Sequence, residues 1–167
     1  MTTAQEEYSR FVKDFLSPRL RDLGFKGSSG RYSLSSDTTW RLLGLQKSTS
    51  NTQDRVRFYI NLTKIDREEW ALLRAARPHF PDAPAPNCSY LRDDMERLTG
   101  PAPSWDGWYV LAGTDLAALA DAIIAALVAK GLPWLTDAEP PTQPSRPAPG
   151  PRGLLARWLS RRKTGPR

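Results

Sequence analysis

Residues 55–64 carry the pattern that most constrains the fold of this chain, because apolar and polar side chains alternate along them. One set is Val56, Phe58, Ile60 and Leu62, and the other is Arg57, Tyr59, Asn61 and Thr63. Successive side chains of a strand point to opposite faces of a sheet. The pattern therefore predicts a half-buried antiparallel strand, with one face on a core and a polar face on the other side.

Three further segments are predicted to be strands of the same sheet. Residues 31–35, 39–48 and 105–112 have strand-like composition, and residues 27–30 are predicted to form a turn before the first of them. The short connections favour an antiparallel meander, because parallel strands need long crossovers. Residues 88–98 fit either a helix or a strand, and their periodicity does not decide between the two.

An amphipathic helix is predicted over residues 5–23, where apolar side chains recur at spacings of three and four. Pro18 lies inside it, which is compatible with a kinked helix or with two abutting helices. Gly24 follows directly and is the residue type best able to take the left-handed conformation that ends a helix. The segment therefore predicts a helix that packs one face on the sheet.

A second long helix is predicted after Thr114, which is suited to cap its first turn. Its apolar positions form one broad face, and Gly131 is predicted to end it. Its longest apolar run, residues 116–129, contains Asp121 and is shorter than the roughly 20 residues that span a bilayer. The helix is therefore expected to belong to a soluble domain.

A shorter helix is predicted over residues 67–77, with Asp66 and Glu69 at the spacing of a capping box. Four prolines follow within residues 78–87. Each proline lacks an amide donor and disfavours helical geometry in the residue before it. This stretch is therefore expected to be an irregular surface loop.

The order of these elements in a chain of 167 residues indicates one α+β domain over residues 1–137. In it, an antiparallel sheet is packed on one face by an N-terminal and a C-terminal helix. Residues 138–152 hold six prolines and few large apolar residues, which predicts an extended linker. Residues 153–167 are expected to form a disordered, basic amphipathic tail.

Most of the net charge of +6 belongs to the end of the chain. Residues 137–167 hold seven basic and two acidic residues, whereas residues 1–136 hold 17 and 16. Nucleic-acid binding needs clustered Lys and Arg, so it is not expected of the folded domain. The tail is a candidate for weak contact with an anionic membrane or with a partner. The residues that would make this contact are Arg157, Trp158, Arg161 and Arg162.

The cysteine and histidine content limits the crosslinks and metal sites that the chain can form. Cys88 is the only cysteine and His79 is the only histidine. One chain therefore cannot form an internal disulfide or a Cys/His zinc site, and no metal or cofactor is predicted. The first residues also lack the order of a signal peptide. The expected location is the cytoplasm.

The acidic segment offers one route to catalysis. Asp93, Asp94 and Asp106 are close in sequence, and paired carboxylates can perform acid–base chemistry or bind a divalent metal. The alternative is a solvated, charge-balanced surface, because Arg92 and Arg97 flank the first two.

The polar side of the central strand offers a binding surface instead. The predicted ligand- or partner-binding residues are Gln46, Arg57, Tyr59, Asn61, Trp105 and Trp108. Antiparallel sheets often leave one face in water, so an ordinary solvated face is the alternative for the strand residues. The two tryptophans flank a turn, where they act either as exposed anchors or as part of the core.

Four stretches of the chain together resemble a family of bacterial proteins. They are LSPRLRDLGF at residues 16–25, GLQKS at 44–48, FYINL at 58–62 and GLPWL at 131–135. This combination is similar to the domain of unknown function family 4304, and the resemblance covers roughly residues 5–136. It implies a small cytoplasmic α+β domain whose sheet is covered by helices, and it supplies no catalytic residues.

Three functions are compatible with the sequence. The favoured one is a non-enzymatic binding or interaction module, regulatory or toxin-neutralising, for an unknown protein or small-molecule ligand. One alternative is a carboxylate-dependent hydrolase or transferase. The other is a peripheral membrane protein that associates through its basic tail. A monomer or a homodimer is expected.

Overall fold

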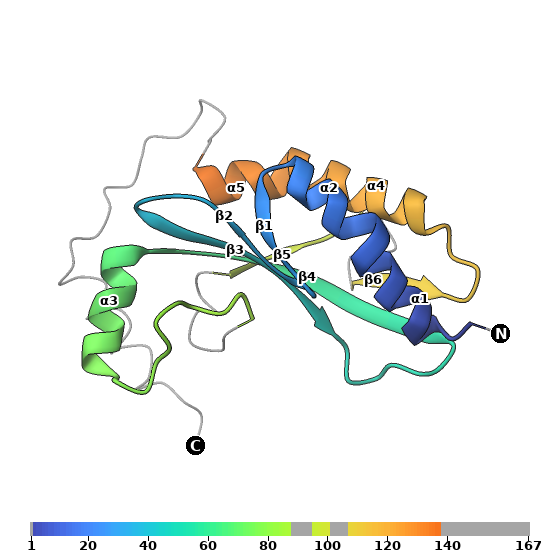
Figure 1. Cartoon of the computed structure of the whole chain (residues 1–167), viewed down its shortest axis with the longest axis horizontal. Coiled ribbons are helices and arrows are strands. Elements are labelled where there is room, and N and C mark those ends of the chain that lie inside the picture. The colour runs from blue at the N-terminus through green and yellow to red at the C-terminus, as the bar shows by residue number, and fades with distance from the viewer. Residues whose placement is uncertain (1, 88–94, 101–106, 138–167) are drawn as a thin grey trace, which may run out of the picture.

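The computed structural model describes residues 2–87, 95–100 and 107–137. These residues form an α+β domain on one antiparallel sheet of order β1-β2-β3-β4-β5, in which β6 also pairs with β4 (Figure 1). The strands are β1 (Phe25–Ser28), β2 (Arg31–Leu34), β3 (Thr39–Lys47), β4 (Arg55–Asp66), β5 (Met95–Leu98) and β6 (Trp108–Leu111). The long strand β4 therefore pairs with β3 along one edge and with both β5 and β6 along the other.

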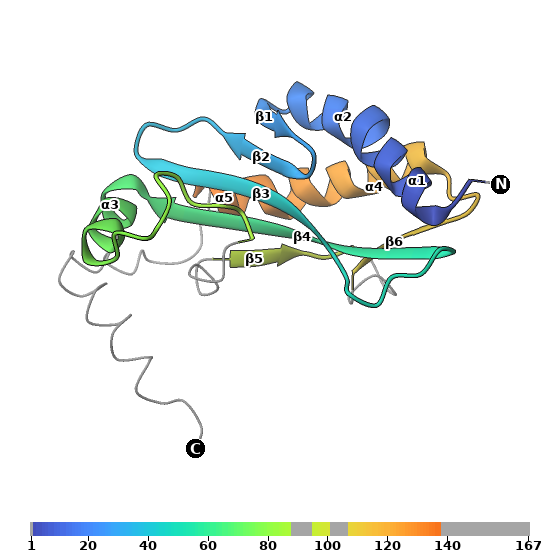
Figure 2. The ribbon, with the colours of Figure 1, turned by 60° about the horizontal axis from the view of Figure 1, so that its bottom comes forward.

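Two long helices cover one face of the sheet, and a shorter helix follows the end of β4 (Figures 1 and 2). The N-terminal helix consists of α1 (Ala4–Arg10), the π-helical segment η1 (Phe11–Leu16) and α2 (Ser17–Asp22). The C-terminal helix consists of α4 (Leu116–Ala126), the π-helical segment η4 (Leu127–Gly131) and α5 (Leu132–Thr136). The shorter helix is α3 (Arg67–Ala76). This arrangement confirms the predicted α+β sheet with two covering helices, whereas the predicted linker and tail lie outside the described residues.

The apolar side of β4 lies at the centre of the main core. Its fully buried side chains are Val56, Phe58, Ile60 and Leu62. The ring centroid of Phe58 lies 5.2 Å from that of Tyr8 and 5.8 Å from that of Phe11, both on the N-terminal helix. The alternation along the strand therefore has the predicted physical cause, because one set of side chains packs against the helices.

A smaller apolar cluster joins α3 to the end of the sheet. Its buried members are Ile65, Trp70, Leu73 and Phe80, with Trp40 packed against them. The Trp70 and Phe80 rings stack with centroids 5.5 Å apart, and Trp70 Nε1 donates to the Asp82 carbonyl oxygen at 3.2 Å. The proline-rich segment after α3 is therefore packed against the domain through Phe80 and hydrogen-bonded to it through Asp82.

The segment predicted as a turn over residues 27–30 is partly a strand. Gly27 and Ser28 belong to β1, which pairs with β2, and only Ser29 and Gly30 form the turn. These two have φ values of 53° and 82°. Positive φ at both central positions matches the right-handed twist of a tight hairpin. The prediction was wrong for Gly27 and Ser28, because these two have turn-like residue types and become part of a strand only through pairing.

The N-terminal helix passes through Pro18 without a break. The π-helical segment η1 ends immediately before α2, and Pro18 occupies one of the first positions of α2. Ser17 Oγ donates to the Val12 carbonyl oxygen at 2.6 Å, five residues back. The wider π-helical turn accommodates a residue without an amide donor, so neither a simple kink nor two separate helices describes the segment. Gly24, with φ of 90°, follows the end of the helix as predicted.

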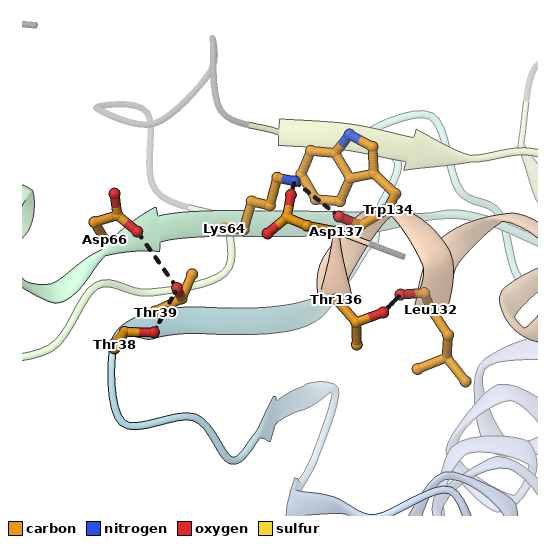
Figure 3. Close-up of polar contacts among 8 residues, drawn as sticks. All are labelled: Thr38, Thr39, Lys64, Asp66, Leu132, Trp134, Thr136 and Asp137. Atoms are coloured by element: carbon orange, nitrogen blue, oxygen red, sulfur yellow. Dashed lines mark hydrogen bonds and ion pairs between the residues drawn. The ribbon is translucent and has the colours of Figure 1, made fainter. Parts of the chain in front are cut away.

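Two predicted helix caps differ in the structure. Asp66 precedes α3 but makes no capping hydrogen bond, and its carboxylate instead accepts from Thr39 Oγ1 at 3.4 Å across the β3–β4 pair (Figure 3). Asp115, not Thr114, caps α4 by accepting from the Ala118 amide at 3.0 Å. Thr114 Oγ1 accepts from the Leu111 amide instead. The side-chain oxygens of Asp66 and Thr114 accept from strand residues instead of from helix amides. The spacing of residue types along the predicted helices does not reveal these contacts.

The C-terminal helix does not end at Gly131. It continues to Thr136, because Gly131 keeps helical backbone angles and lies close to neighbouring side chains. A Cβ at this position would lie 2.5 Å from Leu127 Cδ1 and 2.9 Å from Leu62 Cδ1. The glycine therefore permits close packing of helix on sheet.

The complete helix, Leu116–Thr136, has 21 residues and a mean hydropathy of 1.8 over its most apolar window. By length and composition alone this helix could cross a membrane. This corrects the prediction that the apolar segment is too short to do so. A core helix passes the same test. Leu116, Ala120, Ile123, Leu127 and Leu135 of this helix are buried in the main core.

Lys64 of β4 contacts the C-terminal end of this helix (Figure 3). Its ammonium donates to the Trp134 carbonyl oxygen at 2.9 Å, pairs with the Asp137 carboxylate, and lies 4.9 Å from the Trp134 ring centroid. The last carbonyls of a helix lack intrahelical partners, and a cation there interacts favourably with the helix dipole. The Lys64 side chain therefore joins β4 to the C-terminal end of the helix.

Replacing Lys64 with methionine is expected to lower the free energy of unfolding by about 1 kcal/mol, because the Trp134 carbonyl at the helix end loses its donor. Urea denaturation of the purified protein measures this change. Lys130→Met, at an exposed helical lysine, is the matched control and is expected to change stability by less than about 0.5 kcal/mol. Equal effects of the two substitutions would show that the Lys64 contacts do not stabilise the helix end.

Candidate functional site

The candidate site lies on the face of β4 that points away from the two long helices. Arg57, Tyr59, Asn61 and Thr63 alternate there with the core residues of the strand. Neighbouring strands add side chains in register, because Gln46 of β3 pairs with Tyr59 and Arg97 of β5 pairs with Asn61. We call the surface made by Gln46, Arg57, Tyr59, Asn61 and Arg97 the polar face of β4. It brings together the four strand residues predicted from the sequence and adds Arg97.

The proline-rich segment covers one end of this polar face. Thr63 Oγ1 donates to the Pro86 carbonyl oxygen at 2.8 Å, and Asn87 Nδ2 donates to the Leu45 carbonyl oxygen at 3.2 Å. A Cβ at Gly44 would lie 2.5 Å from Asn87 Oδ1 and 2.8 Å from Pro86 Cβ. The absence of a side chain at Gly44 therefore lets the segment reach the sheet, so it is a packed cover and not only the surface loop predicted.

Asn61 connects the sheet to this cover. It is 1% exposed, and its Nδ2 donates to Gln46 Oε1 at 2.8 Å and to Asn87 Oδ1 at 3.0 Å. Its Oδ1 is buried and accepts no hydrogen bond within the described part of the chain. A buried acceptor without a donor costs free energy, and such groups are rare in folded proteins. A water that donates at this position would therefore be stabilising.

Tyr59 carries two arginines over its ring. The Cζ atom of Arg97 lies 4.2 Å from the ring centroid and that of Arg57 lies 5.6 Å from it. The Tyr59 side chain is half-buried and Arg97 is exposed. Cations at this distance are attracted to the electron-rich face of the ring. The arrangement places positive charge beside an accessible aromatic surface.

The backbone and side chain of Arg57 are held from the β3–β4 connection. Asn51 Oδ1 accepts from the Arg57 amide at 2.8 Å, and Asn51 Nδ2 donates to the Arg57 carbonyl oxygen at 3.1 Å. The guanidinium also donates to Ser48 Oγ at 3.3 Å. The position of this arginine is therefore fixed by the connection between the strands.

Trp108 does not belong to this surface. It is 3% exposed, its indole Nε1 donates to the Leu98 carbonyl oxygen at 3.0 Å, and it pairs with Phe58 on the helix-covered side. Of the two roles that the sequence left open for Trp108, the structure shows the core position, because strand parity directs the side chain to the helix-covered side. Trp105 lies outside the described residues, so its predicted role is untested.

The other predicted functional residues outside the described ranges are Asp93, Asp94 and Asp106, together with Arg157, Trp158, Arg161 and Arg162 of the tail. Within residues 2–87, 95–100 and 107–137, no group of three or more His, Cys, Asp or Glu side chains could hold a metal ion. His79 packs its ring edge-on against Phe80, with centroids 4.9 Å apart. The described residues therefore present a polar and cationic surface, not a set of metal ligands.

The sequence did not reveal Arg97 or Asn87 as part of the site. Residues 88–98 were undecided between helix and strand, and the structure makes Met95–Leu98 a strand. Within a strand, Arg97 and Leu98 point to opposite faces of the sheet, so alternation alone would place Arg97 on the polar face. Its position beside Asn61 follows only from the pairing of β5 with β4.

These features define a small α+β domain with helices on one face of an antiparallel sheet and a polar, partly covered face on the other. The family model described as "Domain of unknown function (DUF4304)" matches residues 16–137, and the chain belongs to this family. The resemblance stated from the four sequence stretches is thereby confirmed. The comparisons with curated proteins and with solved structures found no match.

Proposed function

We propose that this domain is a non-enzymatic interaction module of the cytoplasm, regulatory or toxin-neutralising, that binds an acidic partner protein through the polar face of β4. The observation that supports this most is the half-buried Tyr59 ring with two guanidinium groups over it. Tyrosine and arginine are enriched among the residues that dominate the energetics of protein interfaces.

The charge of the surface favours an acidic partner. Arg97 is exposed and forms no ion pair with any residue that the structure describes. A guanidinium can bind a carboxylate through two parallel hydrogen bonds, which gives both geometry and strength. An aspartate or glutamate of the partner therefore suits the position beside Tyr59.

The supporting residues are already ordered without a partner. Asn51 holds Arg57 through two hydrogen bonds, and Asn61 links Gln46 to Asn87. Fixing side chains before binding lowers the entropy that association would otherwise cost. The buried Asn61 Oδ1 adds an acceptor that an intervening water can use.

The experiment is affinity capture from the native host, followed by reconstitution with the purified partner. Tagged full-length protein is compared with Tyr59→Ala and Arg97→Glu. Lys130→Glu is the control, because it makes the same charge change at an exposed position of the C-terminal helix. Circular dichroism and urea denaturation check that all variants are folded.

We expect a partner whose affinity, measured by calorimetry, falls at least about tenfold in both site variants, which corresponds to about 1.4 kcal/mol. The control is expected to bind like the parent. If every specifically captured protein binds Tyr59→Ala and Arg97→Glu as tightly as the parent, the polar face of β4 is not the interaction surface.

A further inference from the structure

A recess lies on the helix-covered side of the sheet, between the N-terminal helix and the β1–β2 turn. Its volume is about 760 Å³, and its walls include Ser28, Ser29 and Gly30 of the hairpin. Leu45 and Lys47 of β3 also line it, and their pairing with Ile60 and Phe58 places them on the helix side. Small-molecule sites commonly have volumes of about 300–1,000 Å³. We call this recess the helix–hairpin groove.

The groove carries an excess of positive charge. Lys13, Arg21 and Lys47 line it, against one carboxylate, Asp14. Among the residues that the structure describes, neither Lys13 nor Arg21 forms an ion pair or a side-chain hydrogen bond. Cations gathered on the wall of a recess raise the local concentration of anions. The groove is therefore suited to a negatively charged ligand.

The polar groups of the groove follow one ridge of the N-terminal helix. Ser9, Lys13, Ser17 and Arg21 recur at every fourth position and all line the recess. The ridge runs through the π-helical segment η1, which contributes Lys13. Ser17 is buried, and its Oγ lies 2.7 Å from Tyr32 Oη. One helix therefore presents both cations and hydroxyl groups to the same recess.

Lys47 completes the cationic set from the opposite wall. Its Nζ donates to Gln5 Oε1 at 3.1 Å and lies 5.3 Å from the ring centroid of Tyr8. Burial, and to a smaller degree Tyr32, raises the pKa of Tyr8 well above its usual range. The Tyr8 hydroxyl is therefore neutral at physiological pH and adds no negative charge to the groove.

The floor of the groove is apolar. Tyr8, Val12 and Leu45 line it, and Tyr8 and Val12 are buried in the main core. A ligand made only of a charged group would leave the exposed parts of these side chains in water. Burial of a hydrocarbon on them contributes about 25 cal/mol for each Å² removed from water.

We propose that the helix–hairpin groove binds a small organic anion, whose phosphate or carboxylate group pairs with cations of the set Lys13, Arg21 and Lys47 and whose apolar body lies on the apolar side chains. The groove and the polar face of β4 lie on opposite sides of the sheet. This proposal therefore does not depend on the interaction module proposed above.

The test is a titration followed by ¹H–¹⁵N correlation spectra of the full-length protein. The probes are octyl phosphate and octanoate below their micelle concentrations, with octan-1-ol as the uncharged analogue. We expect saturable shifts at the amides of residues 28–30 and 45–47 with both anions. Octan-1-ol is expected to bind at least about tenfold more weakly, because it cannot pair with the cations.

The double variant Lys13→Gln, Arg21→Gln is expected to weaken octyl phosphate binding at least about tenfold, since it removes two cations at exposed positions without changing the core. Lys130→Gln and Tyr59→Ala are the controls and are expected to bind like the parent. Absence of saturable shifts, equal binding of octan-1-ol, or equal binding by the double variant would overturn the proposal.

A final arm separates a soluble anion from a lipid head group. The protein is sedimented with phosphatidylcholine vesicles that contain phosphatidylserine. Retention on vesicles that needs Lys13 and Arg21, without any saturable shift from octyl phosphate, would assign the groove to a membrane surface and reject the small-molecule proposal. Saturable binding of octyl phosphate with no such retention supports it.

Discussion

Replacing Phe58 with alanine is expected to lower the free energy of unfolding by about 3–5 kcal/mol, the range for deletion of a buried aromatic ring. The Phe58 side chain is fully buried and packs against Tyr8 and Phe11 of the N-terminal helix. Its removal leaves a cavity between the sheet and that helix and also removes two aromatic contacts. Urea denaturation followed by circular dichroism measures the loss.

Leu111→Ala is the control for this prediction, because Leu111 is 47% exposed at the end of β6. It is expected to change the free energy of unfolding by less than about 1 kcal/mol, since little apolar surface leaves a packed environment. A Phe58→Ala protein that unfolds at the urea concentration of the Leu111→Ala protein would contradict the position of Phe58 at the centre of the core.

Replacing Gly27 with alanine is expected to destabilise the domain by about 2–4 kcal/mol, through backbone strain and forced separation of β1 from β2. Gly27 has φ of 132°, and a Cβ there would lie 2.1 Å from the Arg31 carbonyl oxygen. That oxygen belongs to the backbone of the paired strand and cannot move without breaking the hairpin. The measurements are urea denaturation and hydrogen exchange of the β1 and β2 amides.

Gly113→Ala separates the effect of backbone strain from that of the forced separation of β1 and β2. Gly113 also has a positive φ, of 79°, but a Cβ there would meet no atom within 4 Å. Its substitution is expected to cost about 1 kcal/mol from backbone strain alone, and to leave the exchange of the hairpin amides unchanged. If Gly27→Ala costs no more than Gly113→Ala, the close approach of β1 and β2 at this position does not exist.

Much of the sheet and of both long helices could be predicted from local patterns. The alternation of residues 55–64 predicted β4 and correctly assigned which of its side chains enter the core. The three- and four-residue spacing of apolar side chains predicted the N-terminal helix almost to its ends. These patterns succeed because the geometry of a helix or strand fixes which neighbours along the chain share a face.

The errors in the fold occur where a contact between distant segments outweighs local composition. Gly27 and Ser28, predicted to lie in a turn over residues 27–30, belong to β1 because they pair with β2. Gly131 has the residue type of a helix end, yet it lies inside the C-terminal helix, where it lets Leu127 and Leu62 pack closely. Neither pairing nor close approach can be read from residues adjacent in sequence.

The candidate site divides in the same way. Arg57, Tyr59 and Asn61 were assigned to one polar face, and Gln46 was expected beside them. Arg97 reaches the Tyr59 ring only because β5 pairs with β4 in one register. A shift of one residue would turn that arginine to the opposite face of the sheet.

The sequence by itself determined the two faces of β4 and the amphipathic character of the helices, because these depend on periodicities of two and of about 3.6 residues. Only the tertiary structure decided what lies against each face. The long helices cover the apolar side, while residues 86–87 close one end of the polar side next to Asn61. It also brought Lys13, Arg21 and Lys47 to one groove. The physical reason is that burial and charge clustering depend on contacts between segments far apart in the chain, which no local period encodes.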